Sequence, residues 1–380
     1  MSDLTSQIEA ALSKVLDPEI HRPITDLDMV DEIRVDQSGV FVRVLLTVPH
    51  CPMRNRIEED VKAALLSVPG IPHFTLELGA MNDEQRAALT QKLRGGEPVH
   101  EIPFAQPGNL TQVIAIASGK GGVGKSSLTV NLAIALAKQG KNVGLLDADI
   151  YGHSVPDMLG IGDDSPTVVD SMIMPVPAFG IRVISMGMLK PSRDAVIAWR
   201  GPVLDRALTQ LLSDVYWGDL DYLLIDLPPG TGDVALSLGQ KIPNSEVIVV
   251  TTPQLAASEV AERAGTMANM MKQRILGVVE NMSYLETTCP HCGQVHRVEL
   301  FGSGGGQAVA RALSVRLGTE VGLLAQIPLE TELRTGGDTG VPIVESDPAA
   351  PSAKAIIGLA ERIAARPRNL VGQSLKLSVE

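Results

Sequence analysis

A glycine-rich segment at residues 118–127 carries the clearest chemical signal in the sequence. It contains the pattern G-x-x-x-x-G-K-S, which runs from Gly119 to Ser126. Glycines at these positions let backbone N–H groups approach phosphate oxygens, because no side chain stands between them. Lys125 has the reach to bind the β- and γ-phosphates, and the Ser126 hydroxyl is a ligand for Mg²⁺. The segment therefore predicts a site for a nucleoside triphosphate and Mg²⁺.

The elements on either side of this loop must position it. Residues 112–117 are apolar and short enough for a buried strand, and residues 126–139 are typical of a helix. A strand, a glycine loop and a helix in this order distinguish a phosphate-binding loop from a chance turn. The helix N-terminus also adds a partial positive charge. The loop residues expected at the nucleotide are Gly119, Lys120, Gly121, Gly122, Val123, Gly124, Lys125, Ser126 and Ser127.

Two later apolar segments end in acidic residues. One ends in Asp147 and is followed by Asp149, and the other, residues 222–226, ends in Asp226. Acids beside phosphates repel them unless the acids serve Mg²⁺ or water. We expect Asp226 to reach Mg²⁺ through water and Asp147 to support the same ion. Gly230 lies in the stiff segment that follows, where its N–H is placed to bind the γ-phosphate.

The cysteines suggest a second kind of chemistry. Cys289 and Cys292 form a C-x-x-C pair on a tight turn, a spacing that places two thiolates on one metal. Two thiols per chain are too few for a four-cysteine site, which leaves several completions open. A dimer could pool two pairs around a [4Fe-4S] cluster or a Zn²⁺ ion. Alternatively, His291 or His296 could join within one chain, or the pair could be a redox dithiol.

The pattern of apolar segments divides the 380-residue chain into two domains. Residues 1–93 alternate helices and strands in a compact α+β unit, and residues 94–110 have the composition of a linker. Residues 111–380 repeat βα units, so we expect an α/β P-loop NTPase domain with a doubly wound, mostly parallel sheet. Its expected strands are 112–117, 143–147, 181–185, 221–226, 246–251, 275–280 and 323–327. Its expected helices are 126–139, 201–214, 233–240, 255–271, 304–316 and 350–365.

Composition narrows the class of protein. The net charge of −12 and the absence of a basic run argue against nucleic acid as a partner. No apolar stretch approaches the length of a membrane span, and the N-terminus does not resemble a signal peptide. Three cysteines cannot build a disulfide framework, so the reducing cytosol is the expected, cytoplasmic location. We expect neither nucleic acid nor membrane as a partner.

The loop resembles the deviant Walker A ATPases, a group that includes MinD, ParA, the nitrogenase iron protein and the Mrp/ApbC proteins. The resemblance rests on K-G-G-x-G-K-[ST], in which Lys120 is the additional lysine. It implies an ATP-dependent homodimer in which Lys120 reaches the partner's nucleotide and Asp149 orients the attacking water. Lys120, Lys125 and Asp149 are then the catalytic residues. Without the resemblance, Lys120 reads as a solvated loop lysine.

The strings D-L-P-P-G-T-G-D, from Asp226, and C-P-x-C followed by F-G-S-G-G-G resemble the Mrp/ApbC iron–sulfur carriers. This resemblance implies a labile [4Fe-4S] cluster that Cys289 and Cys292 bridge across a dimer. The carrier would receive the cluster from assembly scaffolds, pass it to apo iron–sulfur proteins, and hydrolyse ATP slowly. Asn281 would contact adenine, or otherwise be a polar strand cap. The family's final nucleotide-side loop matches residues 327–330 and 334–344.

The N-terminal segment resembles the DUF59/MIP18-like domain of iron–sulfur assembly proteins. The matching strings are Asp-Pro-Glu-Ile from Asp17 and Thr-Val-Pro-His-Cys-Pro-Met around Cys51. Cys51 stands where a strand ends and a helix begins, a position at which the helix dipole favours a thiolate. It is interpreted either as a metal-transfer thiol or as a small buried residue.

Two other functions remain open from the sequence. One is a ParA/MinD-like positioning ATPase, which would need a membrane-binding tail or a basic DNA face. Residues 370–380 contain one lysine and are a poor basic amphipathic helix. The other is an ATPase dimer in which Cys289 and Cys292 form a structural zinc clamp.

Overall fold

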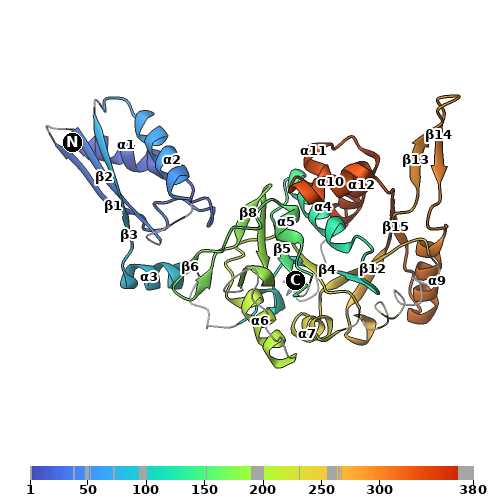
Figure 1. The fold of residues 1–380 in the computed structure, drawn as a ribbon. Helices are drawn as coiled ribbons and strands as arrows, with labels where there is room; N and C mark the ends of the chain where they lie inside the picture. Colours follow the sequence, from blue (N-terminus) through green and yellow to red (C-terminus); the bar gives the residue numbers. More distant parts are fainter. Residues whose placement is uncertain are drawn as a thin grey trace, which may run out of the picture. The chain divides into compact units, whose positions relative to one another are not determined.

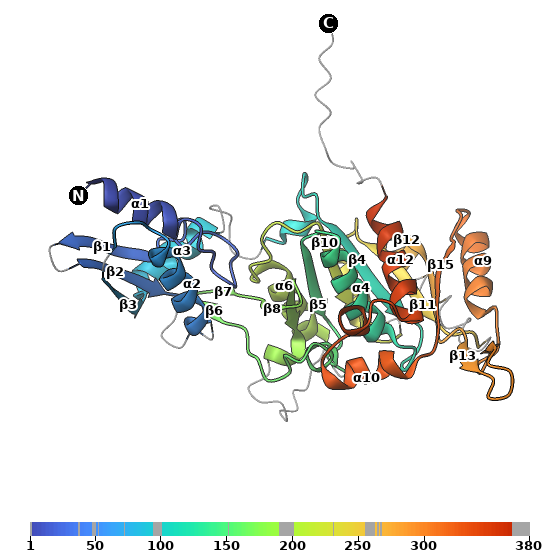
Figure 2. The same cartoon turned by 90° about the horizontal axis from the view of Figure 1, so that it is seen from above.

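The protein folds into two compact units, which are described separately (Figures 1 and 2). The N-terminal unit comprises residues 1–101 together with residues 166–177 and 214–218, and the larger unit comprises the rest of the chain. The computed structural model describes residues 2–36, 39–47, 51, 53–71, 73–93, 101–150, 152–189, 201–230, 232–254, 263, 266 and 268–366.

The N-terminal unit is a three-stranded sheet packed against helices. Strands β1 (Val30–Asp36) and β2 (Gly39–Leu46) pair as an antiparallel hairpin, and β3 (Phe74–Ala80) lies parallel to β2. Alternate β2 residues point into the core and meet the apolar faces of α1 (Ser2–Leu12) and α2 (Arg54–Leu66). The α+β unit of helices and strands that the sequence predicts in residues 1–93 is present. Helix α3 (Asp83–Leu93) was not predicted.

Two segments from the middle of the chain complete this unit. Strands β6 (Val168–Val169) and β7 (Met172–Ile173) form a small antiparallel hairpin. Val169, Met172 and Met174 are buried in the same core as α1 and β2. The backbone N–H of Ile173 donates to Asp214 O at 2.8 Å, which ties in the second segment. Nothing in the local sequence pattern indicated this packing.

The larger unit is built on an eight-stranded sheet with the order β15-β12-β11-β4-β10-β5-β9-β8. The strand pairings are parallel, as predicted, among β4, β5, β9, β10, β11, β12 and β15. All seven expected strands are present, and β8 is an additional strand. The strands are β4 (Gln112–Ser118), β5 (Val143–Asp147), β8 (Val176–Ala178), β9 (Ile181–Ser185), β10 (Tyr222–Asp226), β11 (Glu246–Thr251), β12 (Arg274–Asn281) and β15 (Leu323–Ile327).

Helices cover both faces of this sheet (Figure 1). Helices α4, α10, α11 and α12 lie on one face, and α6 and α7 lie on the other. Helix α4 is buried on almost every side because α12 and the sheet enclose it, which explains its run of Leu, Ile, Val and Ala. The helices are α4 (Lys125–Lys138), α5 (Val155–Met158), α6 (Gly201–Ser213), α7 (Asp233–Lys241), α9 (Gly305–Leu317), α10 (Thr331–Thr339), α11 (Ile343–Ser346) and α12 (Pro351–Ala364), with 3₁₀ turns at Pro103–Ala105 and Met186–Leu189.

Some expectations fall outside this picture. The loop expected within residues 334–344 was wrong at its start, because α10 continues through Gly336 and Gly337. A side chain at Gly336 would lie 2.7 Å from Val341 O, so the glycine there allows close packing rather than a loop. Most of the expected helix 255–271, part of the linker and residues 370–380 lie outside the described residues.

A small hairpin stands apart from the main sheet. Strands β13 (Leu285–Thr288) and β14 (Val295–Val298) pair with each other and project beside α9 (Figure 1). Every β14 residue is exposed. Across the described part of the chain, no helix combines the length and apolar character that a membrane crossing requires.

Candidate functional sites

The glycine loop joins the end of β4 to the start of α4. Gly122 and Gly124 have φ values of 78° and 77°, in the left-handed region that favours glycine. The loop borders a cavity of about 230 Å³. Residues 120–127 line this cavity together with Ser118, Asp149, Gly152, Ser154, Met158 and Pro229. The predicted loop residues from Lys120 to Ser127 therefore surround one pocket, with Gly119 at the loop's start.

Asn281 supports the glycine loop through a hydrogen bond to the loop backbone. It ends β12, and its amide donates to Val123 O at 2.9 Å. A β-carbon at Gly124 would lie 2.2 Å from Asn281 Nδ2, a distance that real contacts do not reach. Gly124 is therefore required by both its backbone conformation and this close approach. The predicted adenine contact of Asn281 stays a prediction, since in this conformation the amide supports the loop backbone.

Lys125 and Asp226 form a buried ion pair at the base of the loop. Lys125 Nζ lies 2.7 Å from Asp226 Oδ1, and the two side chains are 6% and 1% exposed. The Ser126 hydroxyl donates to Asp226 Oδ2 at 2.6 Å. The Thr129 hydroxyl lies 2.8 Å from Asp226 Oδ1. One carboxylate thus gathers the two predicted phosphate- and magnesium-binding side chains of the loop.

Strand register brings a second acid beside Asp226. In the parallel pairing of β10 with β5, Asp226 stands opposite Asp147, and on the other side of β5 Asp147 stands opposite Ser185. Burial and then the neighbouring Asp226 charge raise the pKa of the Asp147 carboxyl. The Ser185 hydroxyl donates to Asp147 Oδ2 at 3.0 Å. Two acids share one lysine here, so we expect Asp147 to hold a proton.

The other predicted residues lie around the same pocket. Asp149 lines it and accepts the Gly152 N–H at 3.0 Å. Lys120 Nζ donates to Gln254 Oε1 at 2.9 Å. Gly230 donates its N–H to Ser118 O at 2.8 Å, so the amide predicted to bind the γ-phosphate is engaged by β4 in this conformation. The loop that carries Gly230 would have to open for that contact to form.

The residues present fit a magnesium nucleotide. Ser126 Oγ and Asp226 Oδ2 are hard oxygen ligands and already lie together. Gly122 has open space where a side chain would stand, which leaves its backbone accessible to phosphate oxygens. In the described conformation Lys125 lines the pocket and its ammonium group is paired with Asp226. For Lys125 to bind phosphate oxygens, this pair would have to separate.

Sequence reasoning missed three supporting side chains. Thr129 lies one helical turn after Lys125 and so faces the same way, a signal that helical spacing contained. The Ser185 hydroxyl on β9 donates a hydrogen bond to Asp147 on the neighbouring strand β5. The Gln254 side chain, which is distant in sequence, accepts a hydrogen bond from Lys120. The last two depend on strand order, which local patterns do not reveal.

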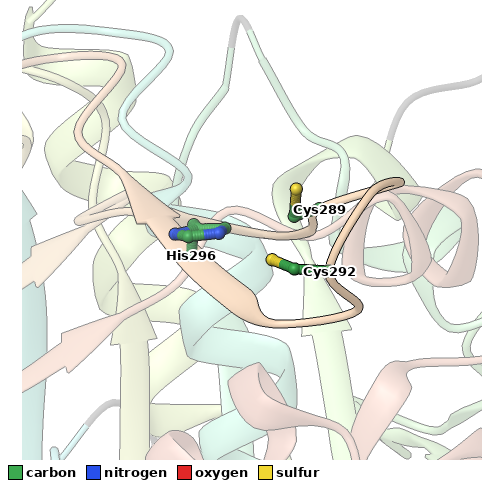
Figure 3. Close-up of side chains that lie close together, drawn as sticks. All are labelled: Cys289, Cys292 and His296. Atoms are coloured by element: carbon green, nitrogen blue, oxygen red, sulfur yellow. The ribbon is translucent and has the colours of Figure 1, made fainter.

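The C-x-x-C pair lies at the end of the β13–β14 hairpin (Figure 3). Cys289 follows β13, and its N–H donates to Gln294 O at 2.8 Å. The Gly293 N–H returns to Cys289 O at 2.9 Å, with Gly293 in the left-handed region at φ 67°. These two bonds close a tight turn that places Cys292 next to Cys289.

Three side chains at this turn form a possible metal-ligand group. The Cys289 and Cys292 Sγ atoms and a ring nitrogen of His296 all lie within 4.8 Å of one another. His291 is in the same turn but does not belong to the group. Backbone hydrogen bonds from Cys292 and then His291 lower the pKa of the Cys289 thiol, which favours the metal-binding thiolate.

The hairpin keeps its register through side chains on its own strands. Arg297 pairs with Glu286 at 3.1 Å across the hairpin and stacks over the Tyr284 ring at 4.2 Å. Val295 and Val298 are 64% and 40% exposed. The cysteine pair is thus presented on a small, partly apolar surface.

The structure distinguishes between the two interpretations of Cys51. Cys51 is 8% exposed, and burial raises the pKa of its thiol to about 11. Desolvation outweighs the adjacent start of α2, and the nearby acids Glu19 and Asp17 act in the same direction as burial. The observation favours the buried-residue interpretation of Cys51.

Comparisons with known proteins identify the family of the chain. Residues 109–364 match the family described as NUBPL iron-transfer P-loop NTPase, and residues 5–74 match the family described as iron–sulfur cluster assembly protein. An iron–sulfur cluster carrier protein of Mycobacterium leprae is 51% identical over 377 residues, which is 99% of this chain and 97% of the relative. A protein of the same name from Deinococcus radiodurans is 43% identical, with 93% of each chain covered.

Among solved structures, a nucleotide-binding protein of Archaeoglobus fulgidus in complex with ADP, described with cobalt, is 38% identical. It superposes with a TM-score of 0.53 over 64% of this chain and 92% of the other. The family match to residues 109–364 spans more than half of the chain and includes both the glycine loop and the cysteine hairpin. The chain therefore belongs to the NUBPL-type iron-transfer P-loop NTPases and carries an iron–sulfur assembly domain at its N-terminus.

Proposed function

We propose that this protein is an ATP-dependent iron–sulfur cluster carrier that holds a labile [4Fe-4S] cluster between two copies of the chain and delivers it to apoproteins. The observation that carries the proposal is the pair of Cys289, partly exposed, and Cys292, exposed, on a hairpin of the P-loop unit. The names of the M. leprae and D. radiodurans relatives support the same cargo. An exposed site suits a cluster that must be handed over.

A homodimer would supply the four thiolates that a [4Fe-4S] cluster takes. One chain provides two cysteines at the turn, and a second copy provides the other two. Val295 and Val298 on β14 and Leu300 after it are 64%, 40% and 54% exposed, and their burial against a second copy would be favourable. The hairpin therefore offers both the ligands and an apolar surface for such an interface.

The nucleotide would act through the buried charge network. When the triphosphate enters the pocket, Lys125 leaves Asp226 and binds phosphate oxygens. Mg²⁺ held by Ser126 and Asp226 would neutralise charge on the phosphates. Gly230 exchanges its bond with Ser118 O for one with the γ-phosphate, so the loop after β10 changes position with the nucleotide state. This movement is how ATP state would reach the dimer interface.

Lys120 and Asp149 would carry out the slow hydrolysis. Asp149 lines the pocket and holds the attacking water, and Lys120 exchanges Gln254 for the phosphates of the partner's nucleotide. Lys120→Ala is expected to lower ATP hydrolysis at least tenfold while leaving ATP binding to the monomer within about twofold, because its role requires the partner. Hydrolysis assays and equilibrium binding measure the two effects. An equal loss of both would contradict a role across the interface.

The carrier function is tested by cluster reconstitution. The full chain is incubated with iron and sulfide under anaerobic conditions, and iron, sulfide and zinc per dimer are measured together with the absorbance of a [4Fe-4S] centre. We expect four iron and four sulfide per dimer, in line with four thiolates. Transfer is then followed as activation of an apo iron–sulfur enzyme.

Cysteine variants locate the cluster. Cys289→Ala and Cys292→Ala are expected to abolish loading, and Cys51→Ala is the matched control because its thiol is buried and neutral. Full loading of the Cys289→Ala variant would refute the assignment. Uptake of zinc but no cluster when the metal-free chain is reconstituted would favour a structural metal clamp instead of a carrier.

A further inference from the structure

The hairpin brings three metal-ligand side chains together within a single chain. The ligand atoms of Cys289, Cys292 and His296 lie within 4.8 Å of one another, and all three side chains belong to one chain (Figure 3). Two thiolates and an imidazole are a common donor set for Zn²⁺ and related ions. A four-cysteine site needs two chains, whereas this group does not.

Strand register explains why His296 joins and His291 does not. Thr287 stands opposite His296 and Thr288 opposite Val295, and the next position pairs Cys289 with Gln294. Alternate residues share one face of a hairpin, so Cys289 and His296 are diagonal neighbours on the same face. His291 lies in the turn itself and does not belong to the group.

The arrangement needs little change to close around an ion. Tetrahedral coordination with Zn–S bonds of about 2.3 Å places two sulfur ligands about 3.8 Å apart, so the present separation has to shrink by about 1 Å at most. All three side chains are wholly or partly exposed, so each can rotate without disturbing a core. The bonds that close the turn, Cys289 N–H to Gln294 O and Gly293 N–H to Cys289 O, fix the backbone beneath them.

We propose that a single chain binds one divalent ion of the zinc class, such as Zn²⁺, Co²⁺ or Fe²⁺, through Cys289, Cys292 and His296. The fourth position stays open to water or to an incoming ligand, which distinguishes this site from a closed structural one. The site shares its cysteines with the proposed cluster but does not require the cluster, and each thiolate can serve one of the two at a time. Bound Zn²⁺ therefore blocks cluster loading.

Cobalt titration of the full, metal-free chain tests the site. Co²⁺ bound by thiolates has intense charge-transfer and d–d absorption that reports both ligand type and geometry. The wild-type protein is expected to bind one Co²⁺ per chain and to remain monomeric by light scattering. Removing one of three protein ligands is expected to weaken binding at least tenfold, in line with the effect of ligand-shell changes on metal affinity.

The two histidines of the hairpin supply a matched pair of variants. His296→Ala is expected to lose affinity and to move toward one Co²⁺ per two chains, because the cysteines of two chains must then combine. His291→Ala is expected to keep wild-type affinity and stoichiometry within about twofold. Both positions are exposed, so circular dichroism should show an unchanged fold for each variant. Equal affinity and stoichiometry in His296→Ala and wild type would overturn the proposal, as would half an ion per chain in wild type.

Cluster reconstitution of the same variants separates this inference from the carrier function. His296→Ala should take up a full [4Fe-4S] cluster, because the cysteines of two chains bind it. Loss of Co²⁺ affinity with full cluster loading in His296→Ala therefore supports both ideas. If wild type binds one Co²⁺ per chain in a His296-dependent manner but takes up no cluster, the ion site stands and the carrier function fails.

Discussion

The nucleotide site and the cysteine hairpin belong to the same unit but are constructed in opposite ways. At the nucleotide site, Lys125, Asp226 and Asp147 are buried, and each has partners on neighbouring strands or helices. At the hairpin, Cys292 and His296 are exposed, and backbone bonds within a short turn supply most of the order. The first site is held by the core, whereas the second is held by its own backbone.

This difference matches what each site has to do. A triphosphate site must exclude water and place charges precisely, which a rigid and buried network achieves. A site that receives and releases metal needs access and tolerates movement. The contrast also implies separate energetics: changes at the nucleotide site should affect folding and binding together, and changes at the hairpin should affect metal alone. The following predictions test that separation.

Lys125→Met should produce the largest loss of stability. It leaves Asp226 buried beside Asp147 without a cation, and removing one partner of a buried pair costs about 3–5 kcal/mol. Urea unfolding of the nucleotide-free chain, followed by circular dichroism, measures the loss. The double variant Lys125→Met with Asp226→Asn should recover most of it, because both charges are then removed. A double variant as unstable as the single one would show that packing, rather than charge, is responsible.

Glu19 is a buried acid that accepts a hydrogen bond from a hydroxyl group. Thr167 Oγ1 donates to Glu19 Oε1 at 2.9 Å, and burial raises the pKa of Glu19 from 4.5 to about 7. The folded state thus favours the protonated form. The stability that this group contributes is complete below pH 4.5 and is lost as the pH rises through 7, by about 3 kcal/mol in all.

Glu19→Gln should remove that dependence on pH. At pH 8 the variant is expected to be more stable than wild type, and at pH 5 the difference should nearly vanish. Unfolding free energies at the two pH values measure the effect, with the exposed Glu9→Gln as the control for the same chemical change. If wild type and Glu19→Gln change in parallel between pH 5 and 8, the carboxyl does not titrate in this range.

Gly124→Ala should have a smaller but specific effect. The backbone at φ 77° disfavours a side chain by about 1–2 kcal/mol, and the new β-carbon displaces the Asn281 amide from Val123 O, at a cost of about 1 kcal/mol. Gly122→Ala is a matched control, because Gly122 has φ 78° but nothing within 4 Å of the added carbon. Urea unfolding of the nucleotide-free chain should show that Gly124→Ala is less stable than Gly122→Ala. Equal losses of stability in the two variants would mean that the Asn281 side chain moves aside without cost.

The sequence predicts the nucleotide site better than the details around it. The sheet and the glycine loop follow from local patterns, since apolar strands and a G-x-x-x-x-G-K-S loop are recognisable within a few residues. The contact of Asp147 with Asp226 and Ser185 depends on strand order, which those patterns do not contain. The packing of residues 166–177 into the N-terminal core is equally non-local.

The hairpin shows the same limit at a smaller scale. The C-x-x-C spacing indicated a metal site but left His291 and His296 as equal candidates. The register of β13 and β14, which places His296 on the face of Cys289, separates them. At Cys51, the position before a helix is one that favours a thiolate. Burial, which the local sequence does not reveal, instead raises the pKa of the thiol.

Serine substitutions at the hairpin should have the smallest effect on stability and so give the sharpest test of the comparison. In metal-free protein, Cys289→Ser and Cys292→Ser are expected to change the free energy of unfolding by less than about 0.5 kcal/mol, because Cys292 is exposed and Cys289 is partly exposed on the hairpin. Cys51→Ser places a hydroxyl in the N-terminal core and is expected to cost about 1–3 kcal/mol. Calorimetry on all three variants provides the measurement. A loss of more than about 1 kcal/mol at Cys292 would mean that the hairpin supports the fold, and the separation between folding and metal binding would then be wrong.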